Sequence, residues 1–349
     1  MTAGASTPVV DAVRGGGPSV DVVIPTLGRP TLAALLDVVA DVPGTVFVVD
    51  DRPDDSTPLV ERPPANVRFV RGRAAGPAAA RNAGWTASAA EWIAFVDDDV
   101  QPPADWPQRL LEDLRSCGRE VGATQGRITV PLPQDRRPTD WERNVAGLQD
   151  AAWATADMAY RRAALQQVGG FDEGFPRAYR EDADLALRVR QAGWQLVRGS
   201  RQILHPVRPA PWWISVRLQR GNADDPLMRA LHGRDWRRRA EVPRGRRRQH
   251  LLTVGAGLAG VAGFWRRSRP LAVAGVGGYA AAVSSFAWRR ISPGPRNGRE
   301  VAAMVATSAV LPFAATYWWL RGWATLPARL SRPAHVSPAA QAADAVPGA

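Results

Sequence analysis

Acidic residues gather at three places in the sequence: residues 50–51 (Asp-Asp), 97–99 (Asp-Asp-Asp) and 181–182 (Glu-Asp). Neighbouring carboxylates repel, and each raises the pKa of the next unless a cation or hydrogen-bond donors compensate. Carboxylate oxygens are also the ligands that hard cations such as Mg²⁺ and Mn²⁺ prefer. The clusters therefore indicate either solvated ends of strands or a site that gathers positive charge.

These acids lie where the elements of an α/β pattern end. Between residues 20 and 130, short β-branched or aromatic runs alternate with segments of helical spacing. The expected strands are 20–24, 45–49, 67–70 and 92–96, and the expected helices are 31–40, 77–90 and 106–117. Such alternation predicts a Rossmann-like, mostly parallel sheet flanked by helices. Ligands of such sheets bind beyond the carboxyl ends of the strands.

Residues 121–205 alternate less clearly, and we interpret them as the second half of the same domain. A helix is expected at 181–192, followed by extended segments at 194–199 and 203–205. The acids at 181–182 would then stand at a helix start, where the helix dipole alone could explain them. Likewise, the role of Arg81 could be purely structural, to pack the expected helix at 77–90 against the sheet.

The composition adds constraints on partners and compartment. The 349 residues carry a formal net charge of +12, and the sequence contains no lysine, so every basic charge apart from histidine is an arginine. Eight arginines against two acids lie between residues 234 and 248. The single cysteine, Cys117, excludes an internal disulfide framework and is typical of a reducing compartment. Residues 1–19 show no signal-peptide core, so the first domain is expected on the cytosolic side.

Three apolar stretches follow, at 251–265, 271–288 and 301–320. The last meets the length of about 20 residues that a spanning helix needs, and the second nearly does. Tryptophans stand at the ends of the stretches, as in an interface belt. We expect membrane association, with the arginine patch near anionic headgroups. Because arginines flank the middle stretch on both sides, a simple set of three spans is not expected. Apart from Trp236, the patch lacks interleaved aromatics, which argues against nucleic acid.

Five short motifs occur in a fixed order along the first part of the chain. They are Val22-Val-Ile-Pro-Thr26, Val48-Val-Asp-Asp51, Ala80-Arg-Asn-Ala-Gly84, Phe95-Val-Asp-Asp-Asp99, and Gly169-Gly-Phe-Asp172 followed by Arg180-Glu-Asp-Ala-Asp-Leu-Ala-Leu-Arg188. This succession resembles glycosyltransferase family 2, over roughly residues 19–205. The resemblance implies a GT-A fold and a nucleotide-sugar donor, with UDP-, GDP- and dTDP-sugars all open.

The resemblance also implies roles for residues on the donor side. Asp50 would contact the nucleobase. Asp97 and Asp99 take the places of the outer acids of the Asp-x-Asp motif, with Asp99 as the main metal ligand and Asp97 beside the ribose or metal. Asp98 is grouped with the donor side but has no separate task, and we expect it to tolerate replacement by asparagine. The other donor-side residues implied are Pro25, Thr26, Arg29 and Arg81.

On the acceptor side, the resemblance makes Asp182 the general base that deprotonates the acceptor hydroxyl, with Glu181 and Trp153 nearby. His205 would join the acids on a Mg²⁺ or Mn²⁺ ion. An inverting transfer needs such a base on the face opposite the leaving nucleotide, and a cation to stabilise the departing diphosphate.

The sequence thus predicts a metal-dependent inverting glycosyltransferase at the cytoplasmic face of the membrane, acting on a lipid-linked or cell-envelope glycan. The alternatives are a sugar-phosphate nucleotidyltransferase and a non-catalytic scaffold of GT-A type. The expected organisation is a flexible leader (1–18), a GT-A catalytic domain (19–210, with a donor half 19–130 and an acceptor half 131–210), an Arg/Trp-rich connector (211–250), apolar membrane-associated helices (251–325) and a disordered tail (326–349).

Overall fold

The computed structural model describes residues 17–331. Most of the expected leader, and residues 332–349 of the expected tail, lie outside this range. The first part of that tail is helical, because the last helix extends to Leu330, beyond the boundary expected at 325.

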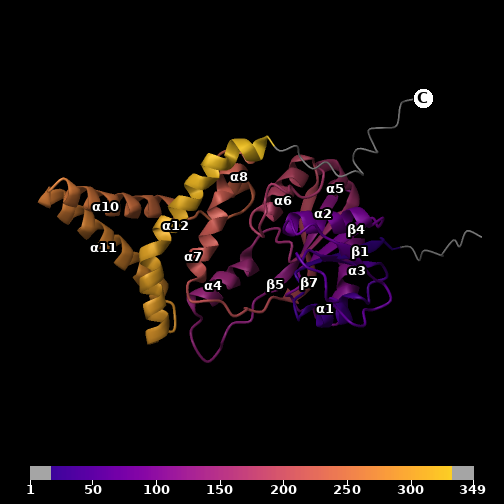
Figure 1. Ribbon diagram of the computed structural model, residues 1–349. Coiled ribbons are helices and arrows are strands. Elements are labelled where there is room, and N and C mark those ends of the chain that lie inside the picture. Colours follow the sequence, from indigo (N-terminus) through magenta and orange to yellow (C-terminus); the bar gives the residue numbers. More distant parts are fainter. Residues whose placement is uncertain (1–16, 332–349) are drawn as a thin grey trace, which may run out of the picture.

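A seven-stranded mixed sheet forms the centre of the N-terminal part, with the strand order β3-β2-β1-β4-β6-β5-β7 (Figure 1). Its strands are β1 (Val20–Thr26), β2 (Val46–Asp50), β3 (Val67–Arg71), β4 (Trp92–Val96), β5 (Val121–Thr129), β6 (Asp157–Arg161) and β7 (Gln195–Leu204). Strands β1 to β4 run parallel, and β5 is parallel to β7. Strand β6 is antiparallel to both of its neighbours, β4 and β5. The expected α/β sheet is therefore confirmed, with one reversed strand at its middle.

Helices cover both faces of this sheet. They are α1 (Leu32–Val39), α2 (Pro77–Ala87), α3 (Trp106–Ser116), α4 (Asp140–Ala146), η1 (Gly147–Asp150), α5 (Arg162–Val168) and α6 (Glu181–Gln191). The alternation of side chains in β1 shows the two layers: Val22 and Ile24 belong to the core beneath α1 and α3, whereas Val23 belongs to the core beneath α2 and α6. Both faces are buried, as expected for strands that read as continuous apolar runs.

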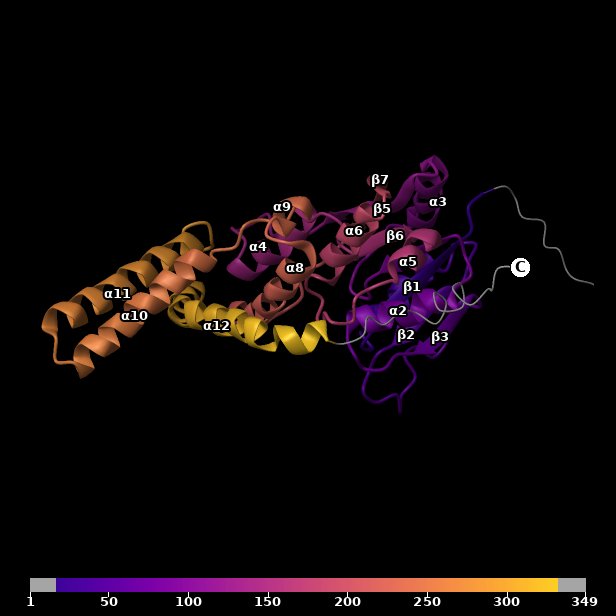
Figure 2. The same ribbon diagram turned by 90° about the horizontal axis from the view of Figure 1, so that it is seen from above.

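The rest of the described chain is helical. It consists of α7 (Ile214–Arg217), η2 (Leu218–Ala223), α8 (Asp225–His232), α9 (Trp236–Arg239), α10 (Arg247–Trp265), α11 (Arg269–Ile291) and α12 (Gly298–Leu330). Helices α10 and α11 form a hairpin that projects away from the sheet, whereas α12 runs back towards it (Figures 1 and 2). By length and composition, α11 and α12 are each sufficient to cross a membrane.

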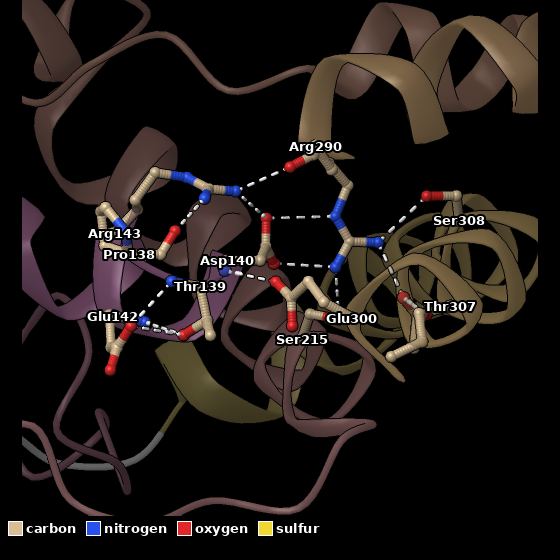
Figure 3. A network of polar contacts seen from close by, with 11 residues as sticks. Pro138, Thr139, Asp140, Glu142, Arg143, Ser215, Arg290, Glu300, Thr307 and Ser308 are labelled. Atoms are coloured by element: carbon tan, nitrogen blue, oxygen red, sulfur yellow. Dashed lines mark hydrogen bonds and ion pairs between the residues drawn. The ribbon is translucent and has the colours of Figure 1, made fainter. Parts of the chain in front are cut away.

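A buried arginine joins these apolar helices to the part of the chain that contains the sheet, residues 17–210, which we expect to be the catalytic part (Figure 3). Arg290, at the end of α11, donates to Asp140 at the start of α4, with a distance of 2.8 Å from Nη2 to Oδ2. It also donates to the hydroxyls of Ser215, Thr307 and Ser308. Because α4, α7, α11 and α12 all contribute to one network around a buried guanidinium, we call these five residues the Arg290 clasp.

Candidate active site

The loop after β1 is tied to the acids after β4. Gly28 has a positive φ of 78°, which lets the chain turn back so that Arg29 lies over the acids. Arg29 pairs with Asp98 (Nε to Oδ1, 3.0 Å) and with Asp99 (Nη1 to Oδ2, 2.7 Å). The hydroxyl of Thr26 donates to Asp98 Oδ2 at 2.6 Å. Burial nevertheless raises the pKa of the Asp98 carboxyl.

Asp98 therefore has a contact role that the sequence did not suggest. We expected it to be the most tolerant of the three acids, yet its side chain is buried and holds both Thr26 and Arg29. The reason is that the loop after β1 folds over the acids and brings both Thr26 and Arg29 to the Asp98 carboxylate.

Arg81, from α2, joins two of the acidic clusters. Its guanidinium donates to Asp97 Oδ1 from Nη2 at 2.8 Å and to Glu181 Oε1 from Nη1 at 3.0 Å. Only 2% of the surface of Arg81 is exposed, and its guanidinium carbon lies 5.5 Å from the centroid of the Phe171 ring. Such a deeply buried arginine needs both acids as partners. The acids after β4 and those at the start of α6 consequently belong to one site.

The neighbouring residue Asn82 explains why the Ala-Arg-Asn-Ala-Gly and Gly-Gly-Phe-Asp motifs occur together. Its side chain binds Phe171 twice, donating from Nδ2 to the carbonyl and accepting at Oδ1 from the backbone N–H, both at 2.9 Å. Gly170 has a φ of 74°, and a Cβ there would lie 2.7 Å from Asn82 Oδ1. The turn before α6 is therefore fixed to α2 through backbone contacts.

The acids at the start of α6 are held in a strained and largely desolvated setting. Arg180, immediately before the helix, has a φ of 80°, which is uncommon for a residue other than glycine. Burial, followed by repulsion from Asp182, raises the pKa of Glu181 to about 8. Burial likewise raises the pKa of Asp182, whose Oδ1 accepts from the backbone N–H of Ala183 at 2.7 Å. The pair is thus poised to hold and exchange a proton near neutral pH.

Three further contacts fix Arg180 and the loop before α6. Arg180 Nε lies 3.2 Å from Asp225 Oδ1, and the guanidinium carbon lies 4.2 Å from the ring of Tyr179 and 5.0 Å from that of Trp236. Nearby, Arg177 Nη2 pairs with Asp224 at 3.0 Å. Residues of α8 and α9, outside the expected catalytic domain, therefore support the start of α6.

Asp50, at the end of β2, is clamped by arginine. Arg52 donates from Nη2 to Asp50 Oδ2 at 2.7 Å and from Nε to Oδ1 at 2.9 Å, and Arg71 Nη1 lies 3.5 Å from Oδ2. The hydrogen bonds from Arg52 hold the pKa of the Asp50 carboxyl below its usual range. Arg52 therefore fixes the orientation of the Asp50 carboxylate at the edge of the sheet. Asp50 takes no part in the contacts that Arg81 makes with Asp97 and Glu181.

His205, just beyond β7, lies beside Asp99. The distance from its Nε2 to Asp99 Oδ1 is 3.7 Å, too long for a hydrogen bond. Arg208 Nε approaches the other oxygen, Oδ2, at 3.1 Å. His205 Nδ1 is buried and has no hydrogen-bond partner within residues 17–331. Asp99 Oδ1 and the imidazole therefore face each other with no hydrogen bond between them.

The expected metal ligands are not all gathered in one place. Across the described part of the chain, no three His, Cys, Asp or Glu side chains form a group that could hold a metal ion by themselves. Asp97 is turned to Arg81, whereas Asp99 is turned to Arg29, Arg208 and His205. Asp99 and His205 together are the part of the predicted set whose ligand atoms face one another.

Trp153 lies in the loop between η1 and β6, in an unusual conformation. Its φ is 63°, and its backbone N–H donates to the side chain of Gln125. The indole Nε1 of Trp153 is buried and has no hydrogen-bond acceptor among the described residues. Oε2 of Glu181 is also buried, and no described residue donates a hydrogen bond to it. Two buried polar atoms of the expected acceptor side thus have no hydrogen-bond partner among the described residues.

The structure also shows site residues that sequence reasoning missed. They are Arg52, Asn82, Arg180 and Arg208. Asn82 and Arg180 lay inside quoted motifs, so their position was a usable signal. Arg52 and Arg208 carried none, because arginine is so common in this sequence that its occurrence near an acid says little.

A family model described as Glycosyl transferase family 2 matches residues 21–186. The match covers just under half of the chain, and it agrees with the resemblance carried by the five sequence motifs. The match ends within α6, so it includes both the acids after β4 and Glu181-Asp182. It favours glycosyl transfer over the nucleotidyltransferase alternative.

Individual relatives are more distant. Two curated proteins from Mycobacterium tuberculosis, from strains CDC 1551 / Oshkosh and ATCC 25618 / H37Rv, are each named pre-mycofactocin glycosyltransferase. Each is 32% identical over 139 residues, which is 35% of this chain and 28% of the relative's length. The chain therefore spans just over a quarter of the curated relatives it matches.

Among solved structures, glucosyl-3-phosphoglycerate synthase from Mycobacterium tuberculosis, crystallised with Mn²⁺, UDP and phosphoglyceric acid, is 17% identical. That similarity covers 66% of this chain and 81% of the other, with a TM-score of 0.43. TarS from S. aureus is 15% identical over 77% of this chain and 55% of its own, with a TM-score of 0.42.

Proposed function

We propose that this protein is a metal-dependent, inverting glycosyltransferase, and that it transfers a sugar from a nucleotide-sugar donor to a hydroxyl of a lipid-linked or cell-envelope glycan. The observation that carries the proposal is that Arg81 joins Asp97 and Glu181 by donating one hydrogen bond to each carboxyl group; we call this contact the Arg81 bridge. Donor-side and acceptor-side acids therefore lie on either side of one guanidinium, as a single transfer step requires.

In this proposal Asp182 is the general base. It removes the proton from the acceptor hydroxyl as that oxygen attacks the anomeric carbon, while the bond from that carbon to the diphosphate breaks. Its raised pKa makes it a stronger base than an ordinary aspartate. Glu181, next to it, also has a raised pKa, so it holds its proton near neutral pH and limits the charge in the pocket.

The donor would bind along the carboxyl ends of β1, β2 and β4. Asp50 is fixed there by Arg52 and can accept hydrogen bonds from a uracil, thymine or guanine base. Pro25 and Thr26 line the same edge, because they end β1 beside β2. Arg29 and Arg208 bring positive charge to the position where the diphosphate would leave.

Asp99 and His205 would hold the divalent cation, whereas Asp97, the other ligand implied by the resemblance, is turned to Arg81. The fit rests on two observations: Asp99 Oδ1 and His205 Nε2 face each other without a hydrogen bond, and both are suitable ligands for Mn²⁺. When bound, Mg²⁺ or Mn²⁺ supplies positive charge to the departing diphosphate. Arg29 and Arg208 share that task from the protein side.

The acceptor class follows from the position of the catalytic part next to apolar helices. The Arg290 clasp holds these helices against α4, and η1 and the loop of Trp153 follow α4 directly in the chain. A hydroxyl of a lipid-linked glycan would reach the site from that side. We place the enzyme at the cytoplasmic face of the membrane, without nucleic acid as a partner.

The test is a binding and hydrolysis screen of the full-length protein in detergent against UDP-, GDP- and dTDP-sugars, with Mn²⁺, with Mg²⁺ and with a chelator. We expect one nucleotide class to bind, with affinity lost when the chelator is added. If no nucleotide sugar binds in any of these conditions, the donor assignment is wrong. Asp99→Asn and His205→Ala should weaken metal-dependent binding, which calorimetry with Mn²⁺ and nucleotide measures directly.

A further inference from the structure

The α10–α11 hairpin is apolar on all its sides. No charged residue occurs in 251–265 or in 271–288. Eight large side chains on the two helices are each more than half exposed: Leu252, Leu258, Val261, Phe264, Trp265, Val273, Val276 and Trp288. A helix that rests flat on a membrane carries a polar face toward water, and this hairpin has none. Its surface is suited to being surrounded by lipid.

Glycines form the contact between the two helices. A Cβ on Gly275 would lie 2.1 Å from the backbone nitrogen of Gly260, and one on Gly263 would lie 2.3 Å from that of Ala272. The helix backbones thus touch. Association through small residues is typical of helix pairs inside membranes, where apolar side chains gain nothing by leaving lipid.

Arginines mark both ends of the hairpin. Residues 242–299 contain eleven arginines and no acid. Three are at the tip (Arg266, Arg267 and Arg269), and eight are at the base (Arg244, Arg246, Arg247, Arg248, Arg289, Arg290, Arg296 and Arg299). At ~1.5 Å per residue, Arg248 and Arg266 are about 27 Å apart along α10, close to the ~30 Å of a bilayer core. The larger number at the base places the base, and the catalytic part, on the cytoplasmic side.

Helix α12 is long enough to span a membrane, but both of its ends are bound to the same part of the protein. Near its start, Glu300 Oε1 accepts from the backbone N–H of Asp140 at 2.7 Å. Near its end, Arg329 donates to Asp224 at 2.7 Å and to the carbonyl of Gly174 at 2.8 Å. Both ends are therefore held by the same catalytic part, on one side of the molecule (Figure 2). A helix that crosses a bilayer must have its ends on opposite sides.

The middle of α12 contacts the hairpin about halfway along its length. The hydroxyl of Tyr279 donates to the carbonyl of Ala309 at 2.9 Å, and the rings of Tyr279 and Phe313 are 6.0 Å apart. The half of the hairpin near its base therefore lies level with α12, and the half from Leu258 to the tip extends beyond it. Each half, at roughly 12–15 Å, is close to the thickness of one leaflet.

We propose that the α10–α11 hairpin crosses an anionic bilayer, and that α12 lies within the near leaflet without crossing. The proposal deepens the membrane association in the proposed function, and it replaces an assignment by length alone, in which α11 and α12 are the two spans. The side chains of Val305 and Val310, both about half exposed on α12, would face lipid of the near leaflet.

The test uses the full chain with Cys117→Ser, reconstituted into sealed vesicles of phosphatidylglycerol and phosphatidylcholine, and a membrane-impermeant maleimide. Three single cysteines are compared: Ser268→Cys at the tip, Gly298→Cys at the start of α12 and Ser331→Cys after its end. A Cβ at position 298 would have no neighbouring atom within 4 Å, so the cysteine fits without a steric clash. Labelling after detergent gives the total for each variant.

We expect Gly298→Cys and Ser331→Cys to be labelled in the same fraction of molecules, and Ser268→Cys in the complementary fraction. Equal labelling at all three positions would show that the hairpin does not cross. Complementary labelling of Gly298→Cys and Ser331→Cys would show that α12 crosses. A protein that remains off the vesicles as a stable oligomer in light scattering would mean that a second copy covers the hairpin. Nucleotide binding by the same variants in detergent tests the proposed function independently.

Discussion

At the scale of single residues, the site depends on two arginines, each of which contacts two carboxyl groups. Arg81 connects Asp97 to Glu181, and Arg29 connects Asp98 to Asp99. The sequence predicted that positive charge must sit among the acids, but it offered a metal as the compensating charge. The structure adds arginine as a second source, which sequence spacing could not reveal because the partners are separated by 16 to 100 residues in the chain.

Glu181 should make stability depend on pH. Because its pKa is raised to about 8 from an ordinary value of 4.5, the folded protein holds a proton that the unfolded chain releases, so stability is lost as pH rises through this window. Glu181→Gln should reduce that loss between about pH 5 and about pH 8 by roughly 2–4 kcal/mol. Urea unfolding at the two pH values measures it. The same pH dependence in variant and wild type would contradict the assignment.

Asp98→Asn tests the corrected role of the middle acid. Asparagine still accepts from Thr26 but loses the ion pair with Arg29. We expect the free energy of unfolding to fall by about 1–3 kcal/mol, as for loss of a hydrogen bond to a buried charged group. Asp54→Asn, at an exposed carboxylate beside Ser56, is the control and should change it by less than about 0.5 kcal/mol. Equal effects would restore the original expectation of tolerance.

At the scale of elements, the four parallel strands and their helices were predictable, because each run is short, apolar and bounded by turn residues. The expected strand at 92–96 matches β4 to the residue, and the expected helix at 181–192 matches α6 except for its last residue. Strand β6 was not predicted. Its sequence, Asp-Met-Ala-Tyr-Arg, carries charges at both ends, and the buried Asp157 depends on distant donors, Trp106 and an arginine.

That arginine, Arg201 on β7, connects β7 to β6 and to α3 in the second half of the sheet. It is fully buried and donates to Asp157 at 2.8 Å and to Asp113 at 3.0 Å. Arg201→Met should lower the free energy of unfolding by about 3–5 kcal/mol, because two buried carboxylates lose their partner. Chemical denaturation measures this, with Arg109→Met, from an exposed pair with Asp105, as the control near zero. Comparable losses in both variants would exclude a special role for Arg201.

At the scale of the whole molecule, the sequence predicted an apolar C-terminal region but not how it meets the catalytic part. Arg290 lies in the sequence Trp-Arg-Arg-Ile, which reads as a helix end beside solvent or headgroups, yet its side chain is buried against Asp140. Only the fold brings α4 to this point, 150 residues earlier in the chain. Sequence periodicity carries no information about such distant contacts.

Asp140→Asn should loosen this connection without unfolding the sheet. The buried guanidinium keeps its three hydroxyl partners but loses its ion pair, so hydrogen exchange should increase in α4 and in the first half of α12 while α2 remains protected. Arg136→Gln, which removes an ion pair with Glu142 on the other side of α4, is the matched control. Unchanged exchange in α12 would show that the clasp does not hold the two parts together.

The central claim is that Asp182 is the base of a glycosyl transfer whose donor binds independently of it. The direct measurement is the rate of transfer and the affinity for the donor nucleotide in wild type and in Asp182→Asn. The account predicts a loss of at least about 10²-fold in transfer, with donor affinity unchanged within about threefold. Transfer that survives in Asp182→Asn, or donor binding that is lost in step with it, would contradict the account.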